Sequence, residues 1–276
     1  MEATGPNADS PVRMFAIDWS GAVRGARKKI WLAEVVDGRL VCLKNGRSRN
    51  QVADYLEAEA ERDPNMVVGF DFAFSLPAWF LEERCLQNAR ELWDLADLEA
   101  EDWLAGCEPP FWGRKGKKRP VFGSECDHYR ITERKVQYET CFGPKSVFQI
   151  NGAGAVGTGS LRGTPVLRRL SKSKAGFSVW PFDAVKLPLV VEIYPRILTG
   201  AVNKSSIYER TKHLATYGDA LCDEMRERAA SNEDAFDAAV SALVMSRHLE
   251  DFVDLTVSAD HRTRLEGEIW HPSRLR

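Results

Sequence analysis

The acidic residues with the clearest chemical potential are those in or beside apolar segments, because burying an unpaired carboxylate is costly. One acid ends an apolar run, one lies near the end of a second run, one lies within a third, and two share a helix face. In chain order these are Asp18, Asp71, Glu192, Asp234 and Asp237. A lone acid of this kind is more often a turn former or helix cap. Several brought together repel one another unless a cation neutralises them.

Oxygen ligands favour Mg²⁺ or Mn²⁺ as that cation. We therefore predict that Asp18, Asp71 and Asp237 hold one or two of these ions, with Glu192 or Asp234 completing the shell. Two such ions about 4 Å apart would activate a water and stabilise the leaving oxygen in phosphodiester cleavage. We therefore expect these acids to be the catalytic residues of metal-dependent phosphodiester hydrolysis.

The first elements that must position these acids are three predicted strands. Apolar residues 12–18 and 29–36 favour strands, and Asp37-Gly38 is a two-residue hairpin signal leading into 39–43. We expect these strands to form an antiparallel meander.

The later elements are read from apolar runs and helical spacing. Residues 50–62 have the apolar spacing of a helix, and 66–72 and 187–194 have the continuous apolar character of buried central strands. Residues 232–249 predict a helix capped by Asn232. The sequence therefore indicates an α/β fold in which the meander is joined by parallel strands and flanked by helices.

The region of about 76–185 shows no clean alternation of elements. Because the strands on either side are expected in one sheet, we interpret it as a long insertion that carries function. The chain is then a single domain, 12–276, after a disordered lead-in, 1–11.

A basic segment lies within this insertion. Its neighbours Phe111 and Trp112 could stack on a base while the cations follow a phosphate backbone. A solvated loop is the alternative. The basic residues are Arg114, Lys115, Lys117, Lys118 and Arg119.

A glycine-rich segment, 151–163, contains the spacing of a dinucleotide-binding motif. In a dinucleotide-binding fold, these glycines come directly after the first strand, and an acid about twenty residues later binds the ribose. This segment does not follow the first strand and has no acid at that distance, so NAD binding is not expected. We predict a loop that offers backbone amides to a phosphate, or a plain mobile loop near the site. The residues proposed for phosphate contact are Gly154, Gly157, Thr158, Ser160 and Arg162.

Overall composition narrows the class of protein. The formal net charge is −2, so attraction to nucleic acid must come from local clusters. The sequence has no membrane-spanning run and no secretory signal, and its scattered cysteines favour reduced thiols. We expect a cytoplasmic protein that does not act at membranes.

The order of these motifs resembles a known family. The segments FAIDWSGA, VVGFDFAFSLP, VEIYPRI, DAFDAAVSAL and EGEIWHP are similar to predicted nucleases of the ribonuclease H-like fold, grouped as domain of unknown function 429. The resemblance covers nearly the whole chain. It implies that Asp18, Asp71 and Asp237 are the catalytic acids and that the partner is nucleic acid, DNA or RNA.

One feature differs from ribonuclease H itself, which has a glutamate on the helix after the third strand. Glu57 and Glu59 do not obviously take that role, whereas resolvase-like relatives complete the site from the final helix, as Asp234 and Asp237 would. Two other functions stay open. One is ATP-dependent phosphotransfer, as in actin-like proteins of related fold, and the other is nucleic-acid binding without catalysis.

Overall fold

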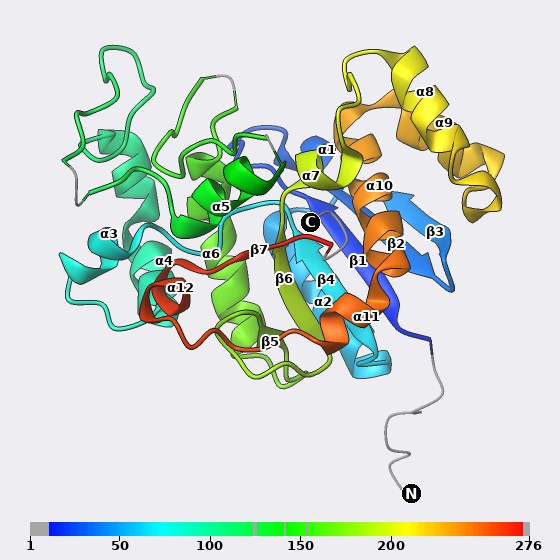
Figure 1. The fold of residues 1–276 in the computed structure, drawn as a ribbon, viewed down its shortest axis with the longest axis horizontal. Helices are drawn as coiled ribbons and strands as arrows, with labels where there is room; N and C mark the ends of the chain where they lie inside the picture. The colour runs from blue at the N-terminus through cyan, green and yellow to red at the C-terminus, as the bar shows by residue number, and fades with distance from the viewer. Residues whose placement is uncertain (1–10, 124–125, 141, 153, 273–276) are drawn as a thin grey trace, which may run out of the picture.

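The computed structural model describes residues 11–123, 126–140, 142–152 and 154–272, which form a seven-stranded mixed sheet flanked by helices (Figure 1). The strand order is β3-β2-β1-β4-β6-β5, and β7 also pairs with β6. The strands are β1 (Arg13–Asp18), β2 (Trp31–Val36), β3 (Arg39–Lys44), β4 (Met66–Phe70), β5 (Ser178–Val179), β6 (Leu189–Ile193) and β7 (Ile269–Trp270). The predicted lead-in lies almost entirely outside the described residues.

The predicted meander is confirmed. Strand β2 runs antiparallel to both β1 and β3. Asp37 and Gly38 join β2 to β3 with φ angles of 48° and 73°, the left-handed pair that a tight hairpin of this twist requires.

The strands that flank the predicted insertion pair directly. Strand β4 is parallel to β1 on one side and to β6 on the other. Parallel strands end at the same edge of a sheet, so residues at the carboxyl ends of β1, β4 and β6 lie near one another. This edge is where the acids predicted from the sequence gather.

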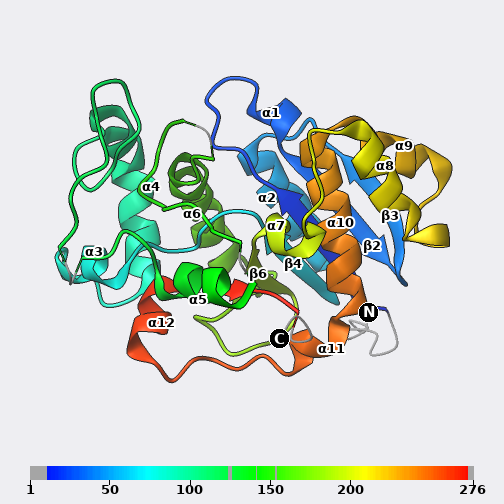
Figure 2. The ribbon, with the colours of Figure 1, turned by 45° about the horizontal axis from the view of Figure 1, so that its top comes forward.

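Helices cover both faces of the sheet, with α10 (Glu233–Arg247) on one face and α2 (Arg49–Arg62) on the other (Figure 2). Side chains of β1 alternate between the two cores: Met14 and Ala16 pack with α10, whereas Phe15 and Ile17 pack with α2 and α6. The helices are α1 (Ala26–Lys29), α2 (Arg49–Arg62), α3 (Ala78–Glu82), α4 (Ala89–Gly106), α5 (Ile131–Thr140), α6 (Gly157–Ser171), α7 (Pro195–Thr199), α8 (Ile207–Ala215), α9 (Asp223–Ser231), α10 (Glu233–Arg247), α11 (Leu249–Val253) and α12 (His261–Glu266), with a 3₁₀ turn at Gly218–Ala220.

Two of these helices match the sequence prediction closely. The Ser48 side chain caps α2 by accepting a hydrogen bond from the Gln51 amide, and the Gln51 side chain accepts one from the Ser48 amide. Asn232 caps α10 as predicted, accepting from the amide of Ala235. The cap fixes where α10 begins and therefore which of its side chains face the sheet.

The region of about 76–185 has its own small core beside β6, built largely from α3, α4 and the segment that precedes α6 (Figure 1). Here one prediction was wrong: the glycine-rich segment is not all loop, because α6 begins at Gly157. Across the described residues, no helix is long and apolar enough to cross a membrane.

Close packing explains the glycine within α6. A Cβ at Gly163 would lie 2.6 Å from ring atoms of Phe72, whose own ring is wedged among other aromatic side chains. Alanine favours a helix over glycine by about 1 kcal/mol, but overpacking a rigid core costs about 1–3 kcal/mol. The steric cost is therefore the larger effect.

We predict that Gly163→Ala lowers the thermal midpoint of unfolding. Gly106→Ala is the matched control, because a Cβ at that helical position would meet only Glu108, at 3.8 Å. Calorimetry should show a loss for the first variant and no loss for the second. An equal or higher midpoint for Gly163→Ala would contradict the close approach of α6.

Candidate functional site

The predicted metal-binding aspartates come from three separate elements. Asp18 is the last residue of β1, and Asp71 directly follows β4. The backbone amide of Asp71 donates to the carbonyl of Ile17 at 3.0 Å, which holds the two strand ends together. Asp237 is on α10, the helix that packs on β1 and β2. The fold therefore brings together acids far apart in the sequence.

Burial and mutual repulsion act together on these carboxylates. Asp18 is 8% exposed and Asp237 is 6% exposed. Burial, followed by the charges of Asp71 and Asp237, holds the pKa of Asp18 well above its usual range. Burial and the charge of Asp237 raise the pKa of Asp71 to about 8, and burial raises that of Asp237 to about 6. Asp237 thus acts on both Asp18 and Asp71, and Asp71 acts on Asp18, so these carboxylates repel one another when they are ionised.

Lys204 is the cation that pairs with Asp237 among the described residues, and the sequence alone did not distinguish it from a surface residue. Its ammonium group donates to Oδ2 of Asp237. The other oxygen, Oδ1, is buried and has no hydrogen-bond partner among the described residues. Lys204 lies in the loop between α7 and α8, where no periodic pattern could have indicated its orientation.

Asp234 has an outer position in the cluster. It is half-buried, and burial raises its pKa, while the charge of Lys29 acts in the opposite direction. Its negative charge still raises the pKa values of Asp18, Asp71 and Asp237. Asp234 therefore adds to the field of the cluster from its edge.

Glu192 differs from the aspartates because both of its oxygens already have partners. Oε2 accepts from the amide of Phe74 and from the guanidinium of Arg130, each at 2.9 Å, and Oε1 accepts from Arg130 at 2.5 Å. Arg130 is 1% exposed and also binds Glu133, whose pKa burial raises to about 7. Sequence reasoning missed Arg130, which neutralises the acid predicted to complete the metal shell.

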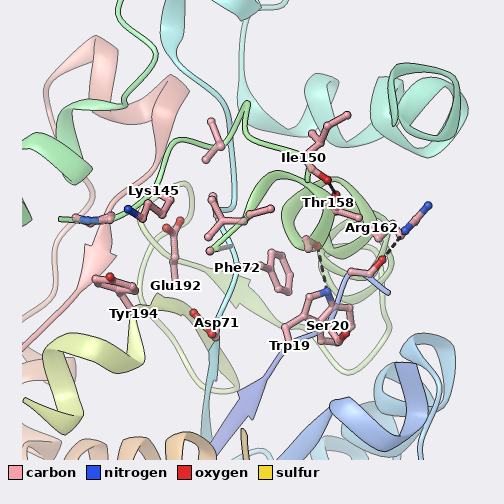
Figure 3. Close-up of a pocket in the computed structure, with 18 of the residues that line it drawn as sticks. Trp19, Ser20, Asp71, Phe72, Lys145, Ile150, Thr158, Arg162, Glu192 and Tyr194 are labelled. Carbon is pink, nitrogen blue, oxygen red and sulfur yellow. Dashed lines mark hydrogen bonds between the residues drawn. The ribbon is translucent and has the colours of Figure 1, made fainter. Parts of the chain in front are cut away.

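A cleft of about 540 Å³ opens at this edge of the sheet. Figure 3 shows Asp71 and Glu192 at its floor, with Tyr194 and Lys145 on one side and Thr158 and Arg162 on the other. Asp71 therefore joins the buried aspartates to a space that a ligand can enter.

The proposed phosphate contacts of the glycine-rich segment divide into lining and structural residues. Gly154 and Thr158 line the cleft, whereas Ser160 is 1% exposed and accepts from the amide of Ala73 at 3.0 Å. A Cβ at Gly157 would lie 2.2 Å from the carbonyl oxygen of Val147, so this glycine allows close backbone packing. Ser160 and Gly157 thus have structural roles.

Arg162 lies at the rim of the cleft with partners of its own. Its guanidinium binds the exposed carboxylate of Glu101 at 2.6 and 2.7 Å and also donates to the carbonyl of Gly21. A phosphate at this rim would compete with Glu101 for Arg162.

The basic segment is only partly beside the cleft. Arg114 and Lys115 line a hollow of about 500 Å³ that shares Ile150, Asn151, Thr158 and Arg162 with the cleft. Lys117 instead pairs with Glu108 at 2.5 Å, and Arg119 contacts His128 at 2.5 Å. Lys118 is exposed and lines neither hollow.

The prediction that Phe111 and Trp112 stack on a base was wrong. The two side chains are 4% and 8% exposed and belong to the core beside β6. Their apolar surface is worth more inside that core than next to the solvated cations.

Comparisons with family models, with curated proteins and with solved structures give no significant match. The described side chains include no group of three or more histidine, cysteine, aspartate or glutamate residues already arranged as metal ligands. The buried aspartates, with Lys204 on Asp237 and one oxygen unpaired, nevertheless have the donor chemistry that a hard divalent cation requires.

We predict that Asp71→Asn stabilises the metal-free protein above neutral pH. An acid whose pKa is raised by folding contributes stability at low pH that is lost as the pH rises through the folded pKa, here about 8. The asparagine variant lacks that loss. Its thermal midpoint in EDTA should exceed that of wild type by several degrees at pH 9, since each ~1 kcal/mol shifts such a midpoint by about 2–4 °C.

The difference between this variant and wild type should shrink towards pH 5. Asp94→Asn is the control, because the exposed Asp94 pairs with Arg168 and Lys172 and has a lowered pKa. That change should give a small loss. A thermal midpoint of Asp71→Asn below that of wild type at every pH would contradict the claim that repulsion among these carboxylates destabilises the metal-free protein.

Proposed function

We propose that this protein is a divalent-metal-dependent phosphodiesterase that acts on nucleic acid. The observation that carries the proposal is the cluster of Asp18, Asp71 and Asp237: Asp18 and Asp237 are buried, Asp71 is half-buried at the cleft, the carboxylates repel one another when ionised, and Asp237 Oδ1 lacks a donor among the described residues. Such an arrangement is costly in a protein whose only task is to fold. Ionisable groups with strongly raised pKa values that lie beside a cleft are typical of functional sites.

In this proposal Asp18, Asp71 and Asp237 hold Mg²⁺ or Mn²⁺. The ion, when bound, supplies an activated water and stabilises the leaving oxygen. Asp71 borders the cleft, so it orients the reactive end of the site towards the substrate. Arg130 donates to both oxygens of Glu192, which leaves the aspartates as the open ligands.

The charges around the cleft support a polyanionic substrate. Lys29, Lys145 and Arg162 line the cleft, and Arg114 and Lys115 line the adjoining hollow. The two spaces adjoin, since they share Ile150, Asn151, Thr158 and Arg162 as lining residues, and a phosphate backbone that crosses this rim would run from the aspartates to the basic segment. This path favours an extended strand of DNA or RNA.

The mixed sheet supports a ribonuclease H-like identity, because the meander joined to parallel strands is what the sequence resemblance implies. The helix after the third strand does not supply the last acid. Glu57 pairs with Arg169, and Glu59 pairs with Arg13. Asp237 on α10 is in the better position, as in the resolvase-like arrangement.

One observation favours hydrolysis over ATP-dependent phosphotransfer. The turn after β1 would have to grip ATP phosphates, yet a Cβ at Gly21 would lie 2.5 Å from the backbone of Thr158 and of Gly159. The first turn of α6 therefore packs directly against one side of this glycine, while Ser20, Gly21 and Ala22 border the cleft on the other. Binding without catalysis would use the same basic path and is separated from hydrolysis by turnover.

The direct test is cleavage of labelled single-stranded, duplex, hybrid and branched nucleic acids with Mg²⁺ or Mn²⁺. We expect metal-dependent products from wild type and a loss in Asp18→Asn of at least the ~10–100-fold that removal of an outer-shell partner costs. Asp94→Asn should keep full activity, because Asp94 is on the exposed surface of α4. Cleavage that survives both Asp18→Asn and EDTA would contradict the proposal.

The path lined by Arg114 and Lys115 predicts that two nearby lysines, Lys115 and Lys118, differ in their contribution to nucleic-acid binding. Lys115→Glu should weaken binding of a fluorescent oligonucleotide in EDTA and reduce the salt slope by about 0.7 for each lost contact with a single strand. Lys118→Glu makes the same charge change on the same segment but lies outside the path. Fluorescence anisotropy should show little effect of this control, and equal effects of both variants would rule out the path.

A further inference from the structure

Lys204 offsets part of the negative charge of the aspartate cluster from a position that the protein holds firmly. Its side chain is 25% exposed, whereas that of its partner Asp237 is 9% exposed, so their contact is screened from most of the solvent. The charge of Lys204 also acts on Asp18 and Asp71. One ammonium group thus serves three carboxylates.

The loop that carries Lys204 is anchored by buried contacts. The guanidinium of Arg210, itself 5% exposed, donates to the backbone carbonyl of Lys204, and its Nε donates to the carbonyl of Ala230 at 2.8 Å. Ser206 then caps α8 by accepting from the amide of Glu209. These bonds fix the backbone of Lys204 opposite α10, so its placement is built into the fold.

One monovalent group leaves the cluster short of positive charge. Asp237 uses Oδ2 for Lys204 while Oδ1 stays buried without a donor, and the Asp18 and Asp71 side chains have no hydrogen bond to the described residues. A divalent cation would supply the missing charge. It would also repel an ammonium group held a few ångströms away, because screening is weak in a buried site.

We propose that Lys204 is a built-in counter-ion that competes with the divalent metal for the Asp18, Asp71 and Asp237 cluster. It is a positioning residue: it keeps the repelling carboxylates together before metal arrives and sets the metal concentration at which the site fills. This inference rests on the proposed function. It identifies a group that makes metal binding weaker and the metal-free fold more stable.

A different role for Lys204 predicts the opposite sign. If the lysine only held Asp237 in the orientation that a metal needs, its removal would weaken metal binding. If it were an ordinary surface ion pair, its removal would change little. The direction of the change in metal affinity therefore distinguishes these roles.

The experiment is calorimetric titration of the full chain with MnCl₂, without nucleic acid and at fixed pH and ionic strength. We expect Lys204→Met to bind Mn²⁺ at least about tenfold more tightly than wild type, because the repelling charge is gone. Lys204→Arg keeps the charge and should stay near wild type. Lys212→Met removes the same charge from an exposed position on α8 and should change the affinity less than about twofold.

Thermal unfolding in EDTA gives a second readout that needs no metal. Lys204→Met should lower the midpoint, and adding Asp237→Asn should restore part of the loss, because the unpaired carboxylate is then absent. If Lys204→Met does not fold, Lys204→Gln keeps a donor for Asp237 without the charge and carries the same prediction for Mn²⁺.

The outcomes separate this inference from the proposed function. Unchanged or weaker Mn²⁺ binding in the Lys204 variants, with wild-type binding lost in Asp71→Asn, overturns the counter-ion role and leaves the metal site standing. Absence of Mn²⁺ binding in wild type overturns both. Tighter binding in Lys204→Met alone supports the competition.

Discussion

The repulsion among buried aspartates at one edge of the sheet is the constraint on which the rest of this structure depends. Asp18 and Asp71 are fixed there by parallel pairing of β1 with β4, and Asp237 by the packing of α10. Burial is the largest cause that raises the pKa values of all three, and the charges of neighbouring carboxylates raise them further. Hydrophobic cores on both faces of the sheet supply the stability that offsets this cost.

Two cations, Arg130 and Lys204, pair with acidic residues at this edge of the sheet in different ways. Arg130 is fully committed to Glu192 and Glu133, in a buried network that closes one side of the cleft. Lys204 makes a single contact with Asp237 and leaves an oxygen unpaired. The first arrangement is complete, whereas the second is open to a further cation. This difference separates the structural part of the acidic edge from the part that can do chemistry.

The sequence could predict the elements whose signals are local. The Asp37-Gly38 hairpin, the Asn232 cap and the apolar runs of β4 and β6 each follow from neighbouring residues. It also singled out Asp18, Asp71 and Asp237, which the structure brings near one another, because acids beside apolar runs stand out. It could not reveal the pairing of Arg130 with Glu192, 62 residues away, or the orientation of Lys204. It also gave no sign that Phe111 and Trp112 are buried, because tertiary packing decides that.

Anomalous scattering from crystals grown with Mn²⁺ would locate the ion directly. We expect a peak among the carboxylates of Asp18, Asp71 and Asp237, with Asn substitution of Asp71 removing it. Glu192 should stay bound to Arg130 in the same crystals. A map with no peak at this edge, and with Lys204 still on Asp237 at saturating Mn²⁺, would contradict the central claim that the aspartates form a divalent-metal site.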